Sequence, residues 1–186
     1  MTVLLLWGVV FSFLMWRDYP LAKNGLEFLY LYLPAGILSS FEVFAILHLV
    51  TSRLSYKFGV HFSFRTFFVS IIISIFTSIF GFIIFVPYYL SIDSGILEIR
   101  ARIFTAILFV TMITGALFLL LSNYLSDDFA VILFTIGSIN MITVFIQSIP
   151  IPPMIGATLM RNNTIYFALI LILEITIILV FGRGIF

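Results

Sequence analysis

Residues Ile103–Ser126 have the sequence IFTAILFVTMITGALFLLLSNYLS, a run without a single charged side chain. An α-helix rises about 1.5 Å per residue, so about 20 apolar residues cross a hydrocarbon core about 30 Å thick. Three more stretches of comparable length are mostly apolar. Thr66–Ile92 and Phe129–Met160 carry no charged residue, and Asn162–Gly182 carries only Glu174. Runs of this length predict transmembrane helices.

The composition of the 186-residue chain excludes a water-soluble globular protein. Hydrophobic residues make up 63% and charged residues only 9%, whereas a soluble domain carries about 25% charge. The net charge is +1 and the basic residues are scattered singly, which excludes nucleic acid as a partner. Cysteine is absent, which removes disulfides and thiolate metal sites. The sequence therefore predicts one integral membrane domain over residues 1–186.

The expected fold is an all-α, polytopic bundle of about six transmembrane helices, because backbone amides in lipid must be hydrogen-bonded within the element that crosses. Met1–Trp16 lacks the basic start and cleavage site of a signal peptide, so we interpret it as part of a retained span. This organisation predicts a multi-pass protein of a cell membrane or an organelle inner membrane. The predicted spans are Thr2–Trp16, Phe28–Val50, Thr66–Leu90, Ile103–Ser122, Phe129–Ser148 and Thr164–Phe181.

The longest polar segment, Thr51–Arg65, contains the densest basic cluster, formed by Arg53, Lys57 and Arg65. Cytoplasmic loops carry an excess of Lys and Arg, but with six spans the basic residues divide almost evenly between the two sides. The orientation therefore depends on this cluster alone. We expect the segment to face the cytoplasm and to dock a partner protein.

One face of the third predicted span is lined with small residues, which let helix backbones approach closely in membranes. Their spacing places them on one side of a helix with 3.6 residues per turn. The pattern predicts a packing face, with a hydroxyl-lined pathway as the alternative. The residues are Ser70, Ser74, Thr77, Ser78 and Gly81.

Few polar side chains lie inside the predicted spans, and a charged carboxylate at the bilayer centre costs about 2.5–3.5 kcal/mol. Such a group handles protons or cations, contacts a substrate or partner subunit, or fixes helix packing in a protonated or hydrogen-bonded form. We expect these side chains to face the bundle interior or water. The candidates are Glu42, His48, Asn140, Gln147 and Glu174.

The two histidines of the chain, His48 and His61, are interpreted as interfacial or packing residues. Glu42 and His48 are six positions apart, which separates them by about 120° around a helix, so they do not form a pair. With His61 in a loop, the chain cannot ligate a haem through two intramembrane histidines. No cluster with metal-ligand spacing accompanies them, so neither a metal nor a cofactor is expected.

The fifth predicted span carries a polar stripe of Asn140, Thr143 and Gln147 and then runs into Ile149–Pro153, where three of five residues are proline. Irregular backbone at this depth is tolerated only where protein buries it or where it lines a wet cavity. The pattern predicts either a vestibule or re-entrant turn, or a proline-capped helix end beside an interhelical hydrogen-bond stripe.

The motifs GxxxxGK[ST], GxGxxG, HExxH and GxSxG are all absent, which leaves no support for an ATPase, a dinucleotide enzyme, a zinc protease or a serine hydrolase. A lipid-modifying membrane enzyme would need a convergent polar cluster at one membrane face. Asp127, Asp128 and His61 do not supply one in the sequence. We do not expect an enzyme.

The segment Trp7–Pro34 (WGVVFSFLMWRDYPLAKNGLEFLYLYLP) resembles ABC-2-type exporter permeases, among them the haem exporter B subunit of cytochrome c maturation. In that family a span gives way to charged residues and then to a Gly-Thr/Ser-Leu-Glu motif. The segment Ser122–Pro150 is also similar to the part of the family where a fifth span runs into a small-residue turn and proline. The chain lacks the residue between Gly and Leu of the motif and the amphipathic N-terminal helix. The likeness rests on Arg17, Asp18, Gly25, Leu26 and Glu27.

The resemblance fits the chain in two alternative registers. If Gly25–Glu27 corresponds to the family's coupling segment, Met1–Trp16 corresponds to its second span and the first is absent. If the six spans are matched in order, coupling to an ATPase falls to Thr51–Arg65. In either register the resemblance implies a permease half that dimerises and borrows a separate ATP-binding subunit.

Two functions are therefore expected from the sequence. The first is a permease subunit of a transporter that moves a hydrophobic or amphipathic cargo, with a second copy or other membrane subunits and an ATP-binding subunit as partners. The alternative is a non-catalytic accessory membrane subunit of a respiratory or other energy-converting complex. The absence of a soluble part and the small number of polar groups suit both.

Overall fold

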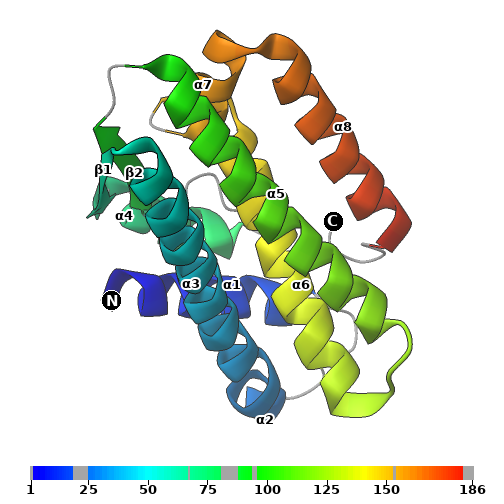
Figure 1. Cartoon of the computed structure of the whole chain (residues 1–186). Coiled ribbons are helices and arrows are strands. Elements are labelled where there is room, and N and C mark those ends of the chain that lie inside the picture. Colours follow the sequence, from blue (N-terminus) through cyan, green and yellow to red (C-terminus); the bar gives the residue numbers. More distant parts are fainter. Residues whose placement is uncertain are drawn as a thin grey trace.

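A computed structural model of the chain describes residues 2–18, 25–66, 68–80, 88–93, 96–152 and 154–181. Over these residues the fold is helical with one two-stranded sheet (Figure 1). The elements in chain order are α1 (Thr2–Asp18), α2 (Gly25–Glu27), the π-helix η1 (Phe28–Tyr32), α3 (Leu33–Phe58), β1 (His61–Thr66), α4 (Phe68–Ile79), β2 (Tyr88–Asp93), α5 (Leu97–Ser122), α6 (Asp127–Ser148), α7 (Ile155–Asn162) and α8 (Thr164–Phe181).

Three helices among the described residues are long and apolar enough to cross a membrane. They are the continuous run Gly25–Phe58, made of α2, η1 and α3, together with α5 and α6. Two shorter apolar helices are Leu5–Arg17 and Thr164–Val180. The helical class predicted from the apolar runs is thus confirmed, and membrane-spanning length is established for three helices.

The predicted third span, Thr66–Leu90, is wrong as a continuous helix. The chain there forms the 12-residue helix α4 and ends in strand β2, which pairs antiparallel with β1 from His61↔Asp93 to Thr66↔Tyr88. A 12-residue helix is about 18 Å long and is too short for a core about 30 Å thick. The strand reflects an alternation in β1, where Phe62 and Phe64 are partly buried and their neighbours His61, Ser63 and Arg65 are exposed.

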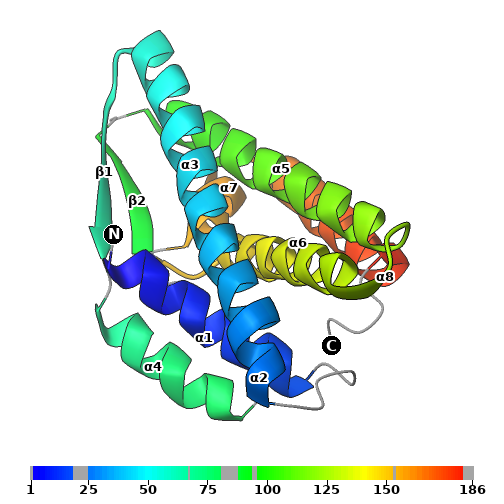
Figure 2. The same cartoon turned by 90° about the horizontal axis from the view of Figure 1, so that it is seen from below.

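Four of the five small residues predicted as a packing face, Ser70, Ser74, Thr77 and Ser78, belong to α4, which packs against α1. Ser74 and Ser78 are buried, whereas the side chain of Ser70 and the whole of Gly81 lie outside the described residues. The Arg17 guanidinium of α1 donates a hydrogen bond to the Ser78 carbonyl oxygen at 3.1 Å, and so caps the C-terminal end of α4. Figure 2 shows α4 beside α1, with α1 crossing α3 obliquely.

Helix α6 lies at the centre of the fold. It contacts α3, α5, α7 and α8, and all residues from Phe134 to Val144 are buried. Its closest neighbour is α5, because a Cβ atom on Gly137 would lie only 2.9 Å from the Gly115 carbonyl oxygen. Two glycines facing each other let the two backbones meet.

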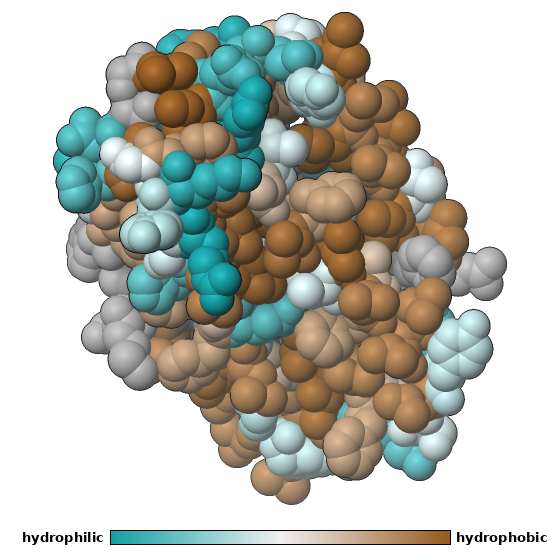
Figure 3. Space-filling model, in the orientation of Figure 1, coloured by the Kyte–Doolittle hydropathy of each residue, from teal (hydrophilic) through white to brown (hydrophobic). Residues whose placement is uncertain are grey.

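The two ends of the bundle differ in charge. The end of α3, the start of α5 and the α7–α8 junction all lie toward the same end of the bundle (Figure 1). We call this the basic end because it carries Arg53, Lys57, Arg100, Arg102 and Arg161. The opposite end, where α2 meets the α5–α6 turn, carries Glu27, Asp127 and Asp128, and we call it the acidic end. In Figure 3 hydrophilic side chains gather over the C-terminal half of α3, whereas α8 and the lower half of α5 present hydrophobic surface.

This distribution corrects the even division of basic residues expected for six spans. That division assumed that the chain crosses between α3 and α5. The pairing of β1 with β2 instead returns the chain to the end where α3 finished, so Arg100 and Arg102 join Arg53 and Lys57 at the same end.

Candidate functional site: a polar node inside the bundle

Four polar side chains from three helices meet in the middle of the bundle. The Asn140 amide nitrogen donates hydrogen bonds to both carboxyl oxygens of Glu42, at 3.1 and 3.0 Å. The Ser39 hydroxyl donates to the Asn140 amide oxygen at 3.1 Å. Thr114 lies at the limit of hydrogen bonding, with its hydroxyl oxygen 3.5 Å from the same amide nitrogen. We call Ser39, Glu42, Thr114 and Asn140 the polar node.

Helix geometry explains how the node assembles. Ser39 and Glu42 are three residues apart on α3 and therefore share a face. Asn140 fits between α3 and α5 because Gly115 leaves room for it: a Cβ atom on Gly115 would lie 3.0 Å from the Asn140 Cβ. The Thr114 hydroxyl donates to the Thr111 carbonyl oxygen of its own helix, which leaves its lone pairs free to accept.

The node is largely shielded from its surroundings. Ser39 and Asn140 have no exposed surface, while Glu42 is half-buried at its edge. No Lys or Arg side chain pairs with Glu42 in the part of the chain that the structure describes. The amide of Asn140 is therefore the main partner of the carboxyl group in an environment where an unpaired polar group is costly.

A second carboxyl group, that of Glu174, is buried elsewhere. Glu174 on α8 has no exposed surface, and neither carboxyl oxygen has a hydrogen-bond partner among the described residues. The side chain of Ser148, at the end of α6, lies beside it, but its hydroxyl also lacks a hydrogen bond of good geometry. A buried polar group without a partner costs about 1–3 kcal/mol, so Glu174 is maintained at the expense of stability.

The described residues of the proline-rich break, 149–152, form a turn directly after α6, and Pro153 lies outside the described residues. Helix α6 ends at Ser148, as the proline pattern predicts, and α7 packs back so closely that a Cβ on Gly156 would clash with the Ser148 carbonyl. Gln147 and Thr143 are buried and line a cavity of only about 10 Å³, which is room for about one water molecule. A wide vestibule is not present at this point of the described structure.

The remaining predicted residues lie apart from the node. His48 is exposed on α3, 3.1 Å from the Ser52 hydroxyl, and its ring lies near Phe62 and Phe64 of β1. The predicted docking residues Arg53, Lys57 and Arg65 are all exposed. The structure therefore joins Glu42 with Asn140 and leaves His48, Gln147 and Glu174 at other places.

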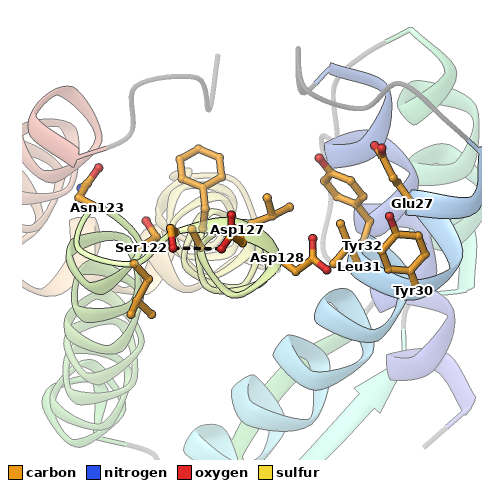
Figure 4. A pocket seen from close by; sticks show the side chains of 13 residues that line it. Glu27, Tyr30, Leu31, Tyr32, Ser122, Asn123, Asp127 and Asp128 are labelled. Atoms are coloured by element: carbon orange, nitrogen blue, oxygen red, sulfur yellow. Dashed lines mark hydrogen bonds between the residues drawn. The ribbon is translucent and has the colours of Figure 1, made fainter.

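The structure also contains a pocket that sequence reasoning missed. A cavity of about 410 Å³ at the acidic end is lined by Glu27, Tyr30, Asp127 and Asp128, among others (Figure 4). The Ser126 hydroxyl donates to the Asp127 carboxyl at 3.1 Å. These residues come from segments about 100 positions apart, so no local pattern could bring them together. His61 lies in β1 at the other end and does not contribute.

The chain has the fold of a helical protein in which three of the described helices are long and apolar enough to cross a membrane, and its interior holds a hydrogen-bonded carboxyl–amide cluster. Comparison with family models, curated proteins and solved structures finds no match. Function must therefore be argued from the site itself.

Proposed function

We propose that the chain is a multi-pass membrane permease subunit that moves a hydrophobic or amphipathic cargo with the help of a separate ATP-binding subunit. The observation that carries the proposal is the polar node. Glu42 stands at the middle of the helical run Gly25–Phe58, and Asn140 lies within one turn of the middle of α6. Ionisable groups at this depth are costly and mark substrate or ion pathways.

The position of the node between helices supports a transport role. Glu42 and Ser39 belong to α3, Thr114 to α5 and Asn140 to α6. A relative movement of α3 against the α5–α6 pair would break the Asn140–Glu42 hydrogen bonds and expose the carboxyl to a cargo. The arrangement in which these hydrogen bonds form and the arrangement in which they are broken therefore differ in free energy.

The basic end supplies a surface for the energy-providing partner. Arg53 and Lys57 on α3 are exposed side chains of one sign at this end, and Arg65, the third predicted docking residue, is exposed farther along β1. Charge complementarity of this kind steers association with an acidic partner surface. Because cytoplasmic segments are rich in Lys and Arg, this end is proposed to face the cytoplasm, where ATP-binding subunits work.

One observation favours the second candidate, an accessory membrane subunit of an energy-converting complex. The cavity beside the node-bearing face of α6 has a volume of only about 10 Å³, and the larger cavities lie at the two ends of the bundle. A closed interior is what a subunit needs if it only shields a neighbour from lipid.

Affinity purification in a mild detergent, followed by mass spectrometry of co-purifying chains, separates the two. A co-purifying ATP-binding subunit supports the permease, and oxidase or dehydrogenase subunits support the accessory role. Recovery of the protein alone as a monomer contradicts both.

The complex then provides a functional test of the node. In proteoliposomes, Glu42→Gln is expected to retain the ATP-binding subunit but to lower ATP turnover, since the substitution replaces the ionisable carboxyl group by an amide of nearly the same shape. Asp128→Asn, at the acidic end, is the matched control and should leave turnover unchanged. Equal turnover in wild type and Glu42→Gln would remove the node from the mechanism.

A further inference from the structure

The largest of the described cavities, about 710 Å³, lies at the basic end between α5 and the α7–α8 junction. This volume is within the range of about 300–1,000 Å³ that small-molecule sites occupy. Its wall carries the ion pair Arg102–Glu98 together with Asn162 and Tyr166, and its apolar part includes Phe109. One side is therefore polar and charged and the other apolar.

The polar and apolar parts of the cavity lie at different depths along α5. The helix has 26 residues, so at about 1.5 Å per residue it is about 39 Å long and exceeds a core about 30 Å thick by about 4–5 Å at each end. Glu98, in the first turn, therefore lies at headgroup level, and Arg102 reaches that level with its long side chain. Phe109 lies about three turns deeper, in the hydrocarbon region. Tyr166 suits the boundary, where aromatic side chains with a polar tip collect.

The charges of the cavity are balanced. The Arg102 guanidinium donates to the Glu98 carboxylate at 2.6 Å, and both side chains are more than half exposed, at 63% and 60%. One contact leaves further N–H donors on Arg102 and a second carboxylate oxygen on Glu98. The lining thus offers a cation for a phosphate and an anion for an ammonium group, side by side.

We propose that this cavity binds one phospholipid with a zwitterionic headgroup bearing a primary ammonium, that is, of the phosphatidylethanolamine class. Arg102 and the Asn162 amide hold the phosphate, Glu98 accepts hydrogen bonds from the ammonium group, and an acyl chain follows α5 past Phe109. A choline headgroup has no N–H to donate to Glu98. An anionic glycerol headgroup brings a phosphate but no cation, so the Glu98 carboxylate would be left without a positive partner once Arg102 holds the phosphate. Both should bind more weakly.

The N-terminus of α8 does not serve as the phosphate site. The Asn163 side-chain oxygen already accepts hydrogen bonds from the backbone N–H groups of Ile165 and Tyr166, at 3.0 and 3.2 Å. The recognition therefore rests on side chains, which substitution can test.

Native mass spectrometry of the full chain, released from detergent in the presence of defined lipids, provides the test. The probes are palmitoyl-oleoyl phosphatidylethanolamine, phosphatidylcholine and phosphatidylglycerol at equal concentration. We expect one retained phosphatidylethanolamine, and about tenfold weaker binding in Arg102→Gln because a charge-assisted hydrogen bond is lost. Glu98→Gln should shift the preference toward phosphatidylglycerol, since it leaves the cationic group unopposed. Lys57→Gln, at the same end but outside the cavity, should change nothing.

A cavity-filling variant covers the case in which a charge variant fails to fold. Ala106→Phe should occupy the apolar part of the cavity and abolish lipid retention. Equal retention of the three lipids by the wild type, or unchanged retention in both Arg102→Gln and Ala106→Phe, would overturn the proposal. Of the proposed function, the lipid site requires only that the protein lies in a membrane. If that part of the proposed function is wrong, the protein will stay soluble without detergent, which is a different result from the loss of lipid binding.

Discussion

Gly8 of α1 and Gly36 of α3 lie in backbone contact, such that a Cβ atom added to Gly8 would stand 2.6 Å from the Gly36 carbonyl oxygen. Each glycine is followed four residues later by a buried serine, Ser12 on α1 and Ser40 on α3. The same small-residue spacing on both helices lets transmembrane helices pack through close van der Waals contact. The position of α1 across α3 follows from this contact (Figure 2).

Enlarging either glycine should separate the two helices. A Cβ on Gly36 would clash with the Gly8 carbonyl and the Ser12 hydroxyl, so Gly36→Val is expected to destabilise the protein by at least about 1–3 kcal/mol. Gly25→Ala is the control, because no atom lies within 4 Å of the added Cβ. Thermal unfolding in detergent measures both, and equal melting temperatures would show that α1 does not pack on α3 in this way.

The Asn140–Glu42 contact should be measurable as a coupling between two substitutions. Asn140→Leu removes the amide that donates to both Glu42 oxygens and leaves the carboxyl without its main partner, whereas Glu42→Leu/Asn140→Leu removes both groups. Interhelical hydrogen bonds in membrane proteins average about 0.6 kcal/mol in double-mutant cycles, with a maximum of about 1.7 kcal/mol. We expect the double variant to be destabilised by less than the sum of the two single destabilisations, and the difference to fall in this range. Strict additivity in denaturant titrations would mean that the hydrogen bonds do not form.

Removal of the Glu174 carboxyl should make the protein more stable. Glu174 is fully buried and neither oxygen is hydrogen-bonded to any residue that the structure describes, so an apolar side chain of similar size removes a cost of about 1–3 kcal/mol. Glu174→Leu is therefore expected to raise the melting temperature, and Glu174→Gln, which keeps a buried polar group, to change it little. A lower melting temperature for Glu174→Leu would reveal a partner for the carboxyl. If the stabilised variant has lost ATP turnover in the complex, the carboxyl is retained for function.

The longest helices could be predicted because apolar length is a property of the sequence alone. Helix α5 contains the whole predicted span Ile103–Ser122 and begins six residues earlier, at Leu97. Helix α6 ends at Ser148, where prolines prevent its continuation. Apolar length also explains why the β1–β2 hairpin was not predicted. The alternation of Phe62 and Phe64 in β1 favours a strand, but β2 is formed by Tyr88–Asp93, at the end of a long apolar run that looks like a span.

The node could not be derived from sequence spacing. Glu42 and Asn140 are 98 positions apart, and their contact depends on Gly115 and Gly137 bringing α5 and α6 together. Each residue could be singled out as a costly polar group in an apolar helix. Which of them meet was decided by tertiary packing, and this separated Glu42 from Glu174 although both are acidic side chains in apolar helices.

Cysteine labelling can decide how the chain crosses the membrane, because the native sequence contains no cysteine. Tyr56, near the C-terminal end of α3, and Tyr124, in the turn between α5 and α6, are 93% and 79% exposed. These two segments lie at opposite ends of the bundle (Figure 1). In a six-span arrangement both would face the same side, since two spans would separate them. With β1 and β2 returning the chain to the basic end, only α5 separates the two ends. We therefore expect a membrane-impermeant maleimide to label Tyr56→Cys and Tyr124→Cys from opposite sides of sealed vesicles.

Leu119→Cys, which is fully buried, should react only after denaturation. Labelling of both tyrosine positions from one side would restore a third span between α3 and α5 and would contradict the common placement of the basic residues at one end.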